Sequence, residues 1–151
     1  MNYRFLGKIW GLMPSFARWG LVRLTQPTFT VSAGAIVLNP ANEVLLLHHI
    51  LRPGSGWGIP GGFLDHGEQP DDAVRREVLE ETGIEITDVS LLRMQTMHRH
   101  IEFVYSARSD GDPRVLSREI TELGWFRPES LPEGLPQAHR KLIEDVWRRG
   151  V

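Results

Sequence analysis

The stretch GFLDHGEQPDDAVRREVLEETGI occupies residues 62–84 and decides the expected fold more than any other part of the chain. It predicts a helix over residues 70–82, because Pro70 suits the first helical position and the two aspartates that follow complement the positive end of the helix dipole. Gly83 is typical of a helix end. A glycine-rich segment, residues 52–62, leads into the helix, and we expect it to form a loop around a short strand near residues 57–60.

Three glutamates of this helix share one face, because Glu77, Glu80 and Glu81 stand at positions i, i+3 and i+4. Neighbouring carboxylates repel each other, and a cation would hold them together. A ligand set made only of oxygen atoms selects a hard ion such as Mg²⁺ or Mn²⁺. The residues alone leave a second interpretation open, in which the glutamates form a solvated face and Arg76 pairs with Glu80 across one turn.

Charge is distributed unevenly along the chain. Eight acidic residues and two arginines lie between Asp65 and Glu85, which gives this segment a formal charge of −6. No acidic residue precedes Glu43, whereas four basic residues do: Arg4, Lys8, Arg18 and Arg23. The overall charge of −2 is therefore the difference between a basic N-terminal segment and an acidic segment that needs positive charge.

Alternating and β-rich segments surround the predicted helix, and the chain closes with a second, amphipathic helix over residues 136–149. The first two segments are joined by turn residues and predict a hairpin. This order predicts an α/β fold with a mixed sheet. The expected strands cover residues 28–38, 43–50, 86–97, 101–107 and 123–127.

The composition of the 151 residues limits the classes of function. The length allows one domain, and the near-neutral charge argues against a stable nucleic-acid partner. The chain has no cysteine, which excludes disulfides, cysteine-ligated zinc, iron–sulfur clusters and thiol catalysis. No apolar run approaches the roughly 18 residues that span a bilayer. These features lead us to expect a cytoplasmic protein.

The nine defined positions of the pattern G-x5-E-x7-R-E-U-x-E-E-x-G-U, where U is a bulky aliphatic residue, are all filled in residues 62–84. By average residue usage, a chance match in such a chain has a probability on the order of 10⁻⁷. The segment resembles the signature of the Nudix hydrolase family, of the MutT type. The order of flanking elements extends the resemblance to residues 28–147, so we expect a Nudix domain over residues 26–151.

The resemblance implies an α/β/α sandwich around a mixed sheet. It also implies Mg²⁺- or Mn²⁺-dependent hydrolysis of a pyrophosphate bond in a nucleoside diphosphate linked to another group. Glu77, Glu80 and Glu81 resemble the metal-binding carboxylates of the family, and the backbone carbonyl of Gly61 resembles a further ligand. Glu77 is our first choice for the general base, acting directly or through a metal-bound water.

Other positions of the signature resemble residues with supporting roles. Arg76 resembles the residue that orients Glu77 and pairs with Glu68, which would make Glu68 mainly structural. Gly62 and Gly83 resemble turn formers. An additional carboxylate of the family comes from a loop after the signature.

Two acidic residues of this chain are candidates for that loop carboxylate. Glu119 is our choice, and Glu122 is the alternative and a candidate substrate contact. An assignment of both to solvated positions stays open.

Substrate contacts are less defined, and the leaving group stays open among nucleoside triphosphates, nucleotide sugars and ADP-ribose-like compounds. We expect His98 and His100 to share one face of a strand, where they could contact phosphate or base. For the aromatic candidates, a position in the core is the alternative to a substrate contact. A nucleotide-binding module without turnover is the alternative function. The candidate contacts are Trp57, Phe63, His98, His100, Tyr105 and Glu122.

Residues 1–25 lie outside the resemblance. Their apolar period predicts helices interrupted at Pro14, and no Ala-x-Ala site supports a secretory signal. Two roles remain open for this extension. It could pack on its own domain or on a second subunit in a homodimer, or it could make peripheral membrane contact as a basic amphipathic helix.

Overall fold

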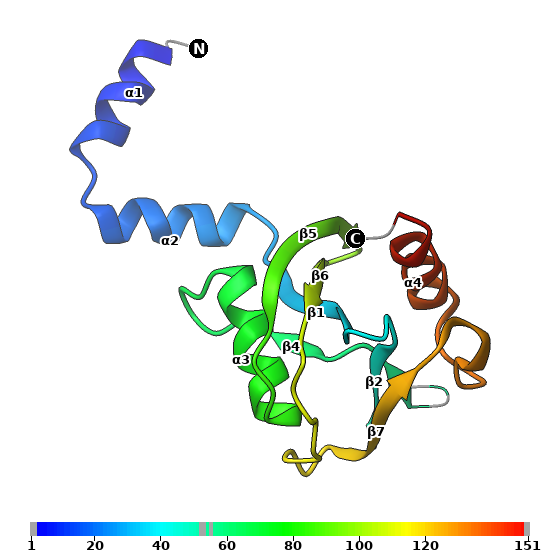
Figure 1. The fold of residues 1–151 in the computed structure, drawn as a ribbon. Coiled ribbons are helices and arrows are strands. Elements are labelled where there is room, and N and C mark those ends of the chain that lie inside the picture. Colours follow the sequence, from blue (N-terminus) through cyan, green and yellow to red (C-terminus); the bar gives the residue numbers. More distant parts are fainter. Residues whose placement is uncertain (1–2, 52–53, 55, 150–151) are drawn as a thin grey trace.

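The computed structural model describes residues 3–51, 54 and 56–149, and Figure 1 shows their arrangement. Within these residues seven strands form one sheet in the order β3-β2-β1-β6-β5, with β4 joined to β1 and β7 joined to β2. The β1 and β6 strands run parallel and the other pairs run antiparallel, so the predicted mixed sheet is confirmed. The strands are β1 (Thr30–Leu38), β2 (Val44–His49), β3 (Trp57–Gly58), β4 (Gly61–Phe63), β5 (Thr87–Met97), β6 (His100–Arg108) and β7 (Ile120–Phe126).

The central strand β1 is buried without interruption from Ala33 to Leu38, because helices cover both faces of the sheet. Its side chains alternate between two apolar clusters. Val37 belongs to the cluster under α3 (Pro70–Thr82), and Ile36 belongs to the cluster under α4 (Gln137–Arg149). The chain therefore folds as the predicted α/β/α sandwich.

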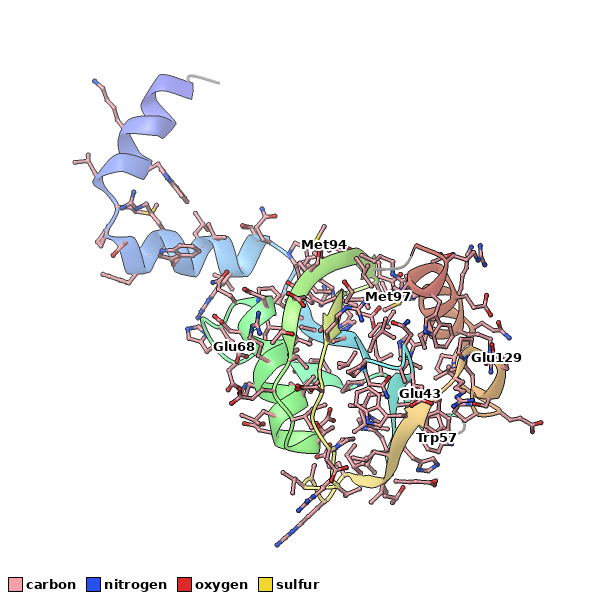
Figure 2. The ribbon with its side chains drawn as sticks, in the orientation of Figure 1. Glu43, Trp57, Glu68, Met94, Met97 and Glu129 are labelled. Atoms are coloured by element: carbon pink, nitrogen blue, oxygen red, sulfur yellow. The ribbon has the colours of Figure 1, made fainter. Side chains whose placement is uncertain are left out.

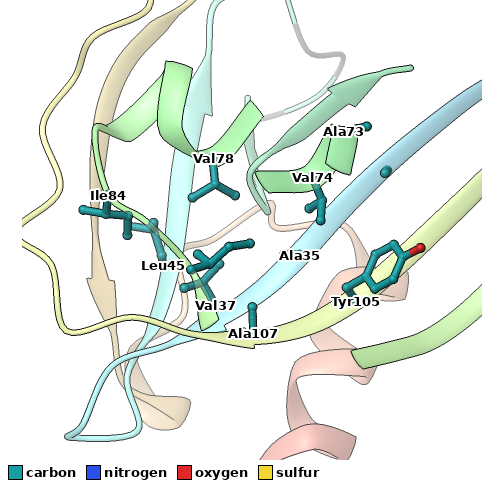
Figure 3. Close-up of a cluster of buried hydrophobic side chains, with 11 residues drawn as sticks. Ala35, Val37, Leu45, Ala73, Val74, Val78, Ile84, Tyr105 and Ala107 are labelled. Carbon is teal, nitrogen blue, oxygen red and sulfur yellow. The ribbon is translucent and has the colours of Figure 1, made fainter. Parts of the chain in front are cut away.

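Figure 3 shows the cluster under α3, where Val74 and Val78 of the helix face Leu45, Val37 and Ala35 of the sheet. Burial of these aliphatic side chains fixes the helix across the strands. On the opposite face, α4 contributes Ile143 and Val146, which are fully or almost fully buried. Each helix thus has one apolar face committed to the sheet.

The ends of α3 agree with the sequence prediction. Pro70 opens the helix and Gly83 follows it in a left-handed conformation with φ of 74°. The Gly83 N–H donates to the carbonyl of Leu79 at 2.8 Å, which satisfies one of the last helical acceptors. The predicted bounds of this helix are confirmed at both ends.

The glycine-rich segment differs from the prediction. Residues 61–63 form strand β4, antiparallel to β1, where a loop was expected. Gly61 has φ of 142°, and a Cβ at this position would collide with the backbone of Ala33 and Gly34. The strand forms because glycine permits an approach between two backbones that a side chain would prevent.

Two further helices precede the sandwich, α1 (Tyr3–Leu12) and α2 (Ser15–Thr25), and they extend away from it (Figure 1). They are separated at Pro14, as predicted, and α2 has no buried residue. A short 3₁₀ helix, η1 (Pro128–Ser130), precedes α4. Among the residues described, no helix is both long and apolar enough to cross a membrane. The role of the extension stays a prediction.

A leucine-to-alanine substitution should have a large effect on stability in the buried sheet and a small one on the exposed helix α2. Leu46→Ala removes a fully buried side chain and should lower the free energy of unfolding by about 2–5 kcal/mol. Leu24→Ala, at a side chain 86% exposed on α2, should change it by no more than about 0.5 kcal/mol. Urea denaturation monitored by circular dichroism measures both. Equal losses would show that α2 is packed in solution.

Candidate functional site

A cleft of about 450 Å³ opens where α3 passes β4 and the segment that precedes β7. Carboxylates dominate its lining, together with one arginine and one histidine. The cleft brings together most of the site residues expected from the sequence. It is lined by His49, Gly61, Gly62, Phe63, Asp65, Arg76, Glu77, Glu80, Glu81, Ser117 and Glu119.

Arg76 organises the acidic residues around it. Its Nε and Nη2 atoms donate to the two carboxylate oxygens of Glu68 at 2.8 and 2.9 Å, in the paired geometry that suits a guanidinium. Its Nη1 atom donates to Glu77 at 2.8 Å and to Glu80 at 3.3 Å. Nη2 also donates to the carbonyl of Phe63 at 3.2 Å. One side chain thus ties the helix to β4 and to the loop between them.

The hydrogen bonds between Arg76 and Glu68 also shift the pKa values of both residues. Hydrogen bonds from Arg76, and then from the Asp65 N–H, lower the pKa of Glu68 from 4.5 to about 2. The Glu68 carboxylate in turn raises the pKa of Arg76. Both groups therefore stay ionised in the folded protein at neutral pH.

Glu81 lies deepest among the helical carboxylates, with 8% of its surface exposed. Its Oε2 atom accepts a hydrogen bond from the Gly61 N–H at 3.0 Å. Its Oε1 atom lies 3.8 Å from Nδ1 of His49 on β2. Glu81 therefore stands at the junction of α3, β2 and β4, beside the Gly61 backbone.

Gly62 has a different structural role from the turn that the sequence predicted. The expectation that it forms a turn is wrong, because Gly62 lies within β4 and pairs with Ala33. A Cβ at Gly62 would meet the carboxylate of Glu77. The absence of a side chain thus makes room for Glu77 in the cleft, whereas Gly83 does end the helix.

The carboxylates of Glu77, Glu80 and Glu81, which the sequence predicts as cation ligands, line the cleft together with Gly61. Within the part of the chain that the structure describes, no three acidic or histidine side chains surround a common point, because Arg76 and the Gly61 amide hold the carboxylates. Carboxylate oxygens and a backbone carbonyl nevertheless fit a hard divalent cation in their chemistry, and the lack of a side chain at Gly62 lets the Glu77 carboxylate lie in the cleft. Such an ion would compete with the bonds from Arg76.

The two acidic candidates after the signature lie in different places. Glu119 lines the cleft, and its backbone N–H donates to Oγ of Ser117 at 3.3 Å. Its carbonyl accepts from the Ile50 N–H at 2.9 Å, which holds this segment beside the end of β2. Glu122 lies on β7 opposite His48 and is not part of the cleft lining.

Phe63 lines the cleft and packs against His100, which is not part of the cleft lining. The Phe63 side chain is 64% exposed, and its ring meets the edge of His100 with centroids 5.8 Å apart. The two ring nitrogens of His100 lie 2.9 Å from the hydroxyls of Thr30 and Ser32. A second hollow of about 190 Å³ shares Gly61, Gly62 and Phe63 with the cleft, and Glu102 and His139 contribute to its other walls.

Three of the expected substrate contacts lie elsewhere. Tyr105 is buried in the cluster under α3, and this burial raises the pKa of its hydroxyl. Trp57 packs edge-on against Phe126, with centroids 5.2 Å apart, on the α4 side of the sheet. The expectation that His98 shares a strand face with His100 is wrong, because His98 lies in the turn after β5 with φ of 55°.

His49 and Ser117 line the cleft and were not predicted from the sequence. Alternation along β2 could have indicated His49, because Leu45 belongs to the cluster under α3 and residues four apart on a strand share a face. The neighbouring His48 points to the other side, where its ring meets the edge of Trp57. No comparable periodicity precedes Ser117, which lies in a loop.

Comparison with known proteins agrees with this geometry. A model of the NUDIX domain matches residues 28–146. The chain belongs to the Nudix family. A solved MutT NUDIX hydrolase from Burkholderia pseudomallei is 34% identical, with a TM-score of 0.68 over 80% of this chain and 98% of the other. The resemblance drawn from residues 62–84 is confirmed.

Curated relatives place the chain within the wider Nudix family. A MutT-like protein from Streptomyces ambofaciens is 28% identical over 81% of this chain and 79% of its own length. The NAD-capped RNA hydrolase NudC from Pectobacterium atrosepticum is 30% identical over 74% of this chain, but the match spans 45% of that protein. The 8-oxo-dGDP phosphatase NUDT18 from Mus musculus is 35% identical over 72% of this chain and 35% of its own length. These similarities support the assignment of the chain as a pyrophosphohydrolase.

The Arg76–Glu68 pair predicts a dependence of stability on pH. The folded state depresses the pKa of Glu68 to about 2, so its stabilising effect is present above pH 4.5 and is lost as pH falls towards 2. Urea denaturation between these pH values should show this loss in the native protein and a weaker one in Glu68→Gln. Glu129→Gln, at an exposed position on the far side of the molecule (Figure 2), should keep the native slope. Parallel curves for the native protein and Glu68→Gln would contradict this assignment.

Proposed function

We propose that this Nudix protein hydrolyses a pyrophosphate bond in a nucleoside diphosphate linked to another group, with Mg²⁺ or Mn²⁺ as cofactor. The observation that carries this proposal is the arrangement of Glu77, Glu80 and Glu81 in one cleft beside Gly61. A pyrophosphate carries several negative charges and would be repelled by these carboxylates alone. A divalent cation between them removes that repulsion.

The proposed cation ligands are the carboxylates of Glu77, Glu80 and Glu81 and the carbonyl of Gly61. When bound, the ion would neutralise phosphate charge and lower the pKa of a coordinated water. Glu81 is the most firmly positioned of the ligands, because it is buried and accepts the Gly61 N–H at 3.0 Å. The fixed position of this carboxylate would define where the phosphate chain lies.

Glu77 is the proposed general base. Arg76 donates to one of its oxygens at 2.8 Å, which fixes the orientation of the carboxylate in the cleft and leaves the other oxygen to face a water. Arg76 is in this view a positioning residue, held in turn by Glu68. Glu119, from the opposite wall, is the alternative base.

The rival proposal is a Nudix module that binds a nucleotide without hydrolysing it. A NUDIX domain of NrtR from Shewanella oneidensis, solved in complex with ADP ribose, has a TM-score of 0.73 to this chain over 92% of it and all of the other, but 19% identity supports the fold alone. The relatives named above act on different nucleotide compounds, so they do not select one leaving group. The complete set of Arg76, Glu77 and Glu81 favours turnover, because binding alone does not require a positioned base.

A phosphate-release screen tests the proposal against the rival. The native protein, with Mg²⁺ or Mn²⁺, should hydrolyse at least one member of a panel of nucleoside triphosphates, nucleotide sugars, ADP-ribose, dinucleoside polyphosphates and NADH. Glu81→Gln should lower the rate by roughly 100-fold or more, because it removes a charged ligand, and should bind Mn²⁺ more weakly by electron paramagnetic resonance. Glu129→Gln should retain both properties. Calorimetric binding of a panel member without hydrolysis would favour the rival module.

The two acids after the signature should differ in their effect on catalysis. Glu119→Gln should lower kcat by about 10²–10⁴-fold if Glu119 is the base, and by less if it only contacts the substrate. Glu122→Gln should leave kcat and KM unchanged, because Glu122 lies outside the cleft lining. Steady-state kinetics on the best substrate of the screen measure both variants. A larger loss in Glu122→Gln would contradict the placement of these residues.

A further inference from the structure

The extension formed by α1 and α2 exposes large apolar side chains that the proposed hydrolytic function does not use. Phe16 is 78% exposed, Trp19 68% and Leu24 86%. On α1, Leu12 is 86% exposed and Trp10 42%. A soluble domain rarely leaves so many large apolar side chains in water unless they mark an interaction surface.

The apolar side chains of α2 are organised along the helix. Phe16, Gly20 and Leu24 stand at i, i+4 and i+8, so they form one row on the helix surface. Gly20 has no atom of another part of the molecule within 4 Å of a Cβ placed on it, so this row faces open space. Arg23 lies beside this row, whereas Arg18 lies on the opposite side of the helix, so α2 carries positive charge both next to its apolar row and behind it.

The charge of the extension has one sign. Its four basic residues meet no acidic residue before Glu43. The remaining 13 basic and 19 acidic residues leave a formal charge of −6 on the rest of the chain. No acidic residue within the extension can therefore pair with these cations, and α2 has no buried residue.

From these observations we propose that α1 and α2 dock the protein on an anionic lipid bilayer. Phe16, Trp19 and Leu24 would enter the boundary between headgroups and acyl chains, and Arg23 beside them would contact phosphate and carboxylate headgroups. Arg18, on the other side of the helix, would add attraction to the anionic surface over roughly 10 Å, about one Debye length. Tryptophan suits this boundary because its ring is apolar and its N–H is polar. An 11-residue helix is roughly 16 Å long, so α2 would lie along the surface.

A flat surface explains the arrangement better than a second protein chain. A helical partner would select a narrow apolar seam that continues along one axis. Here Pro14 divides the extension into two helices with different directions (Figure 1), and both carry exposed tryptophan. Two short helices at an angle can both contact one flat membrane surface. Both helices carry positive charge, which would be attracted to an anionic membrane.

Vesicle flotation with the full chain tests this proposal. The protein should float with vesicles of phosphatidylcholine and phosphatidylserine, and much less with phosphatidylcholine alone. Raising NaCl from about 0.1 to about 0.5 M should weaken the binding, because salt screens the charges. Arg18→Gln with Arg23→Gln should lower the partition coefficient roughly 25-fold, or about fivefold per cation. Phe16→Ser with Trp19→Ser should lower it at least about tenfold.

Matched substitutions on the sandwich separate a local surface from general charge or apolarity. Arg99→Gln with Lys141→Gln removes the same charge, and Leu91→Ser with Met94→Ser changes two exposed apolar residues of β5 (Met94 is labelled in Figure 2). Both control pairs should float as the native protein does. Equal flotation with neutral and anionic vesicles, or no flotation with either, would overturn the proposal.

The mass in solution tests whether a second copy of the chain covers the apolar side chains of the extension instead. Light scattering should give the mass of one chain for the native protein in the absence of vesicles. A two-chain mass that falls to one chain in Phe16→Ser with Trp19→Ser would overturn the proposal, since a second copy would then cover the apolar face. Circular dichroism establishes that each variant is folded, and Leu24→Ala provides an independent apolar variant of the same row.

Discussion

The cleft depends on the hydrogen bonds of the Arg76 guanidinium, because this group lies among carboxylates that would otherwise repel each other. It donates to Glu68 through two atoms, to Glu77 and Glu80 through a third, and to the carbonyl of Phe63. Its planar fork can satisfy acceptors in several directions at once, which the ammonium of a lysine could not do with the same geometry. The network joins helix, loop and strand β4, so the positions of the catalytic candidates and the local stability have a common origin.

A second constraint is the close approach of backbones at β4. Gly61 and Gly62 bring this strand against β1 and allow Glu77 to reach the cleft, while the Gly61 N–H fixes Glu81. Arg76 holds the glutamates of α3 and the loop, and the two glycines provide the backbone wall of the cleft. Together they place a buried, a half-buried and an exposed carboxylate (Glu81, Glu77 and Glu80) in one cleft, at a cost in electrostatic repulsion that a divalent cation would reduce.

Local signals predicted α3 well, because Pro70, Gly83 and the spacing of the glutamates act within one helix. The mixed sheet followed from the order of alternating segments, and the sandwich followed from the family resemblance. Features that depend on contacts between distant segments did not follow: β4 forms through a glycine approach to β1, and His49 reaches Glu81 only after β2 and α3 pack. Tyr105 illustrates the same limit, since it was a candidate substrate contact but the register of β6 places it in the core.

The opposite charges of the extension and the cleft raise the question of why they do not pair. Arginines of α2 that settled on Glu77 and Glu80 would occupy the positions that phosphate and its counterion need, and they would replace a mobile ion by a permanent bond. The structure instead neutralises the cleft in part from within, through Arg76, and leaves α2 without buried residues. Residual negative charge then remains where the proposed cation would bind, and the positive charge of the extension remains available for the proposed anionic surface. If the proposed hydrolysis and the proposed docking are both correct, the cleft and the extension act at separate places, and substitutions in one should add to those in the other without coupling.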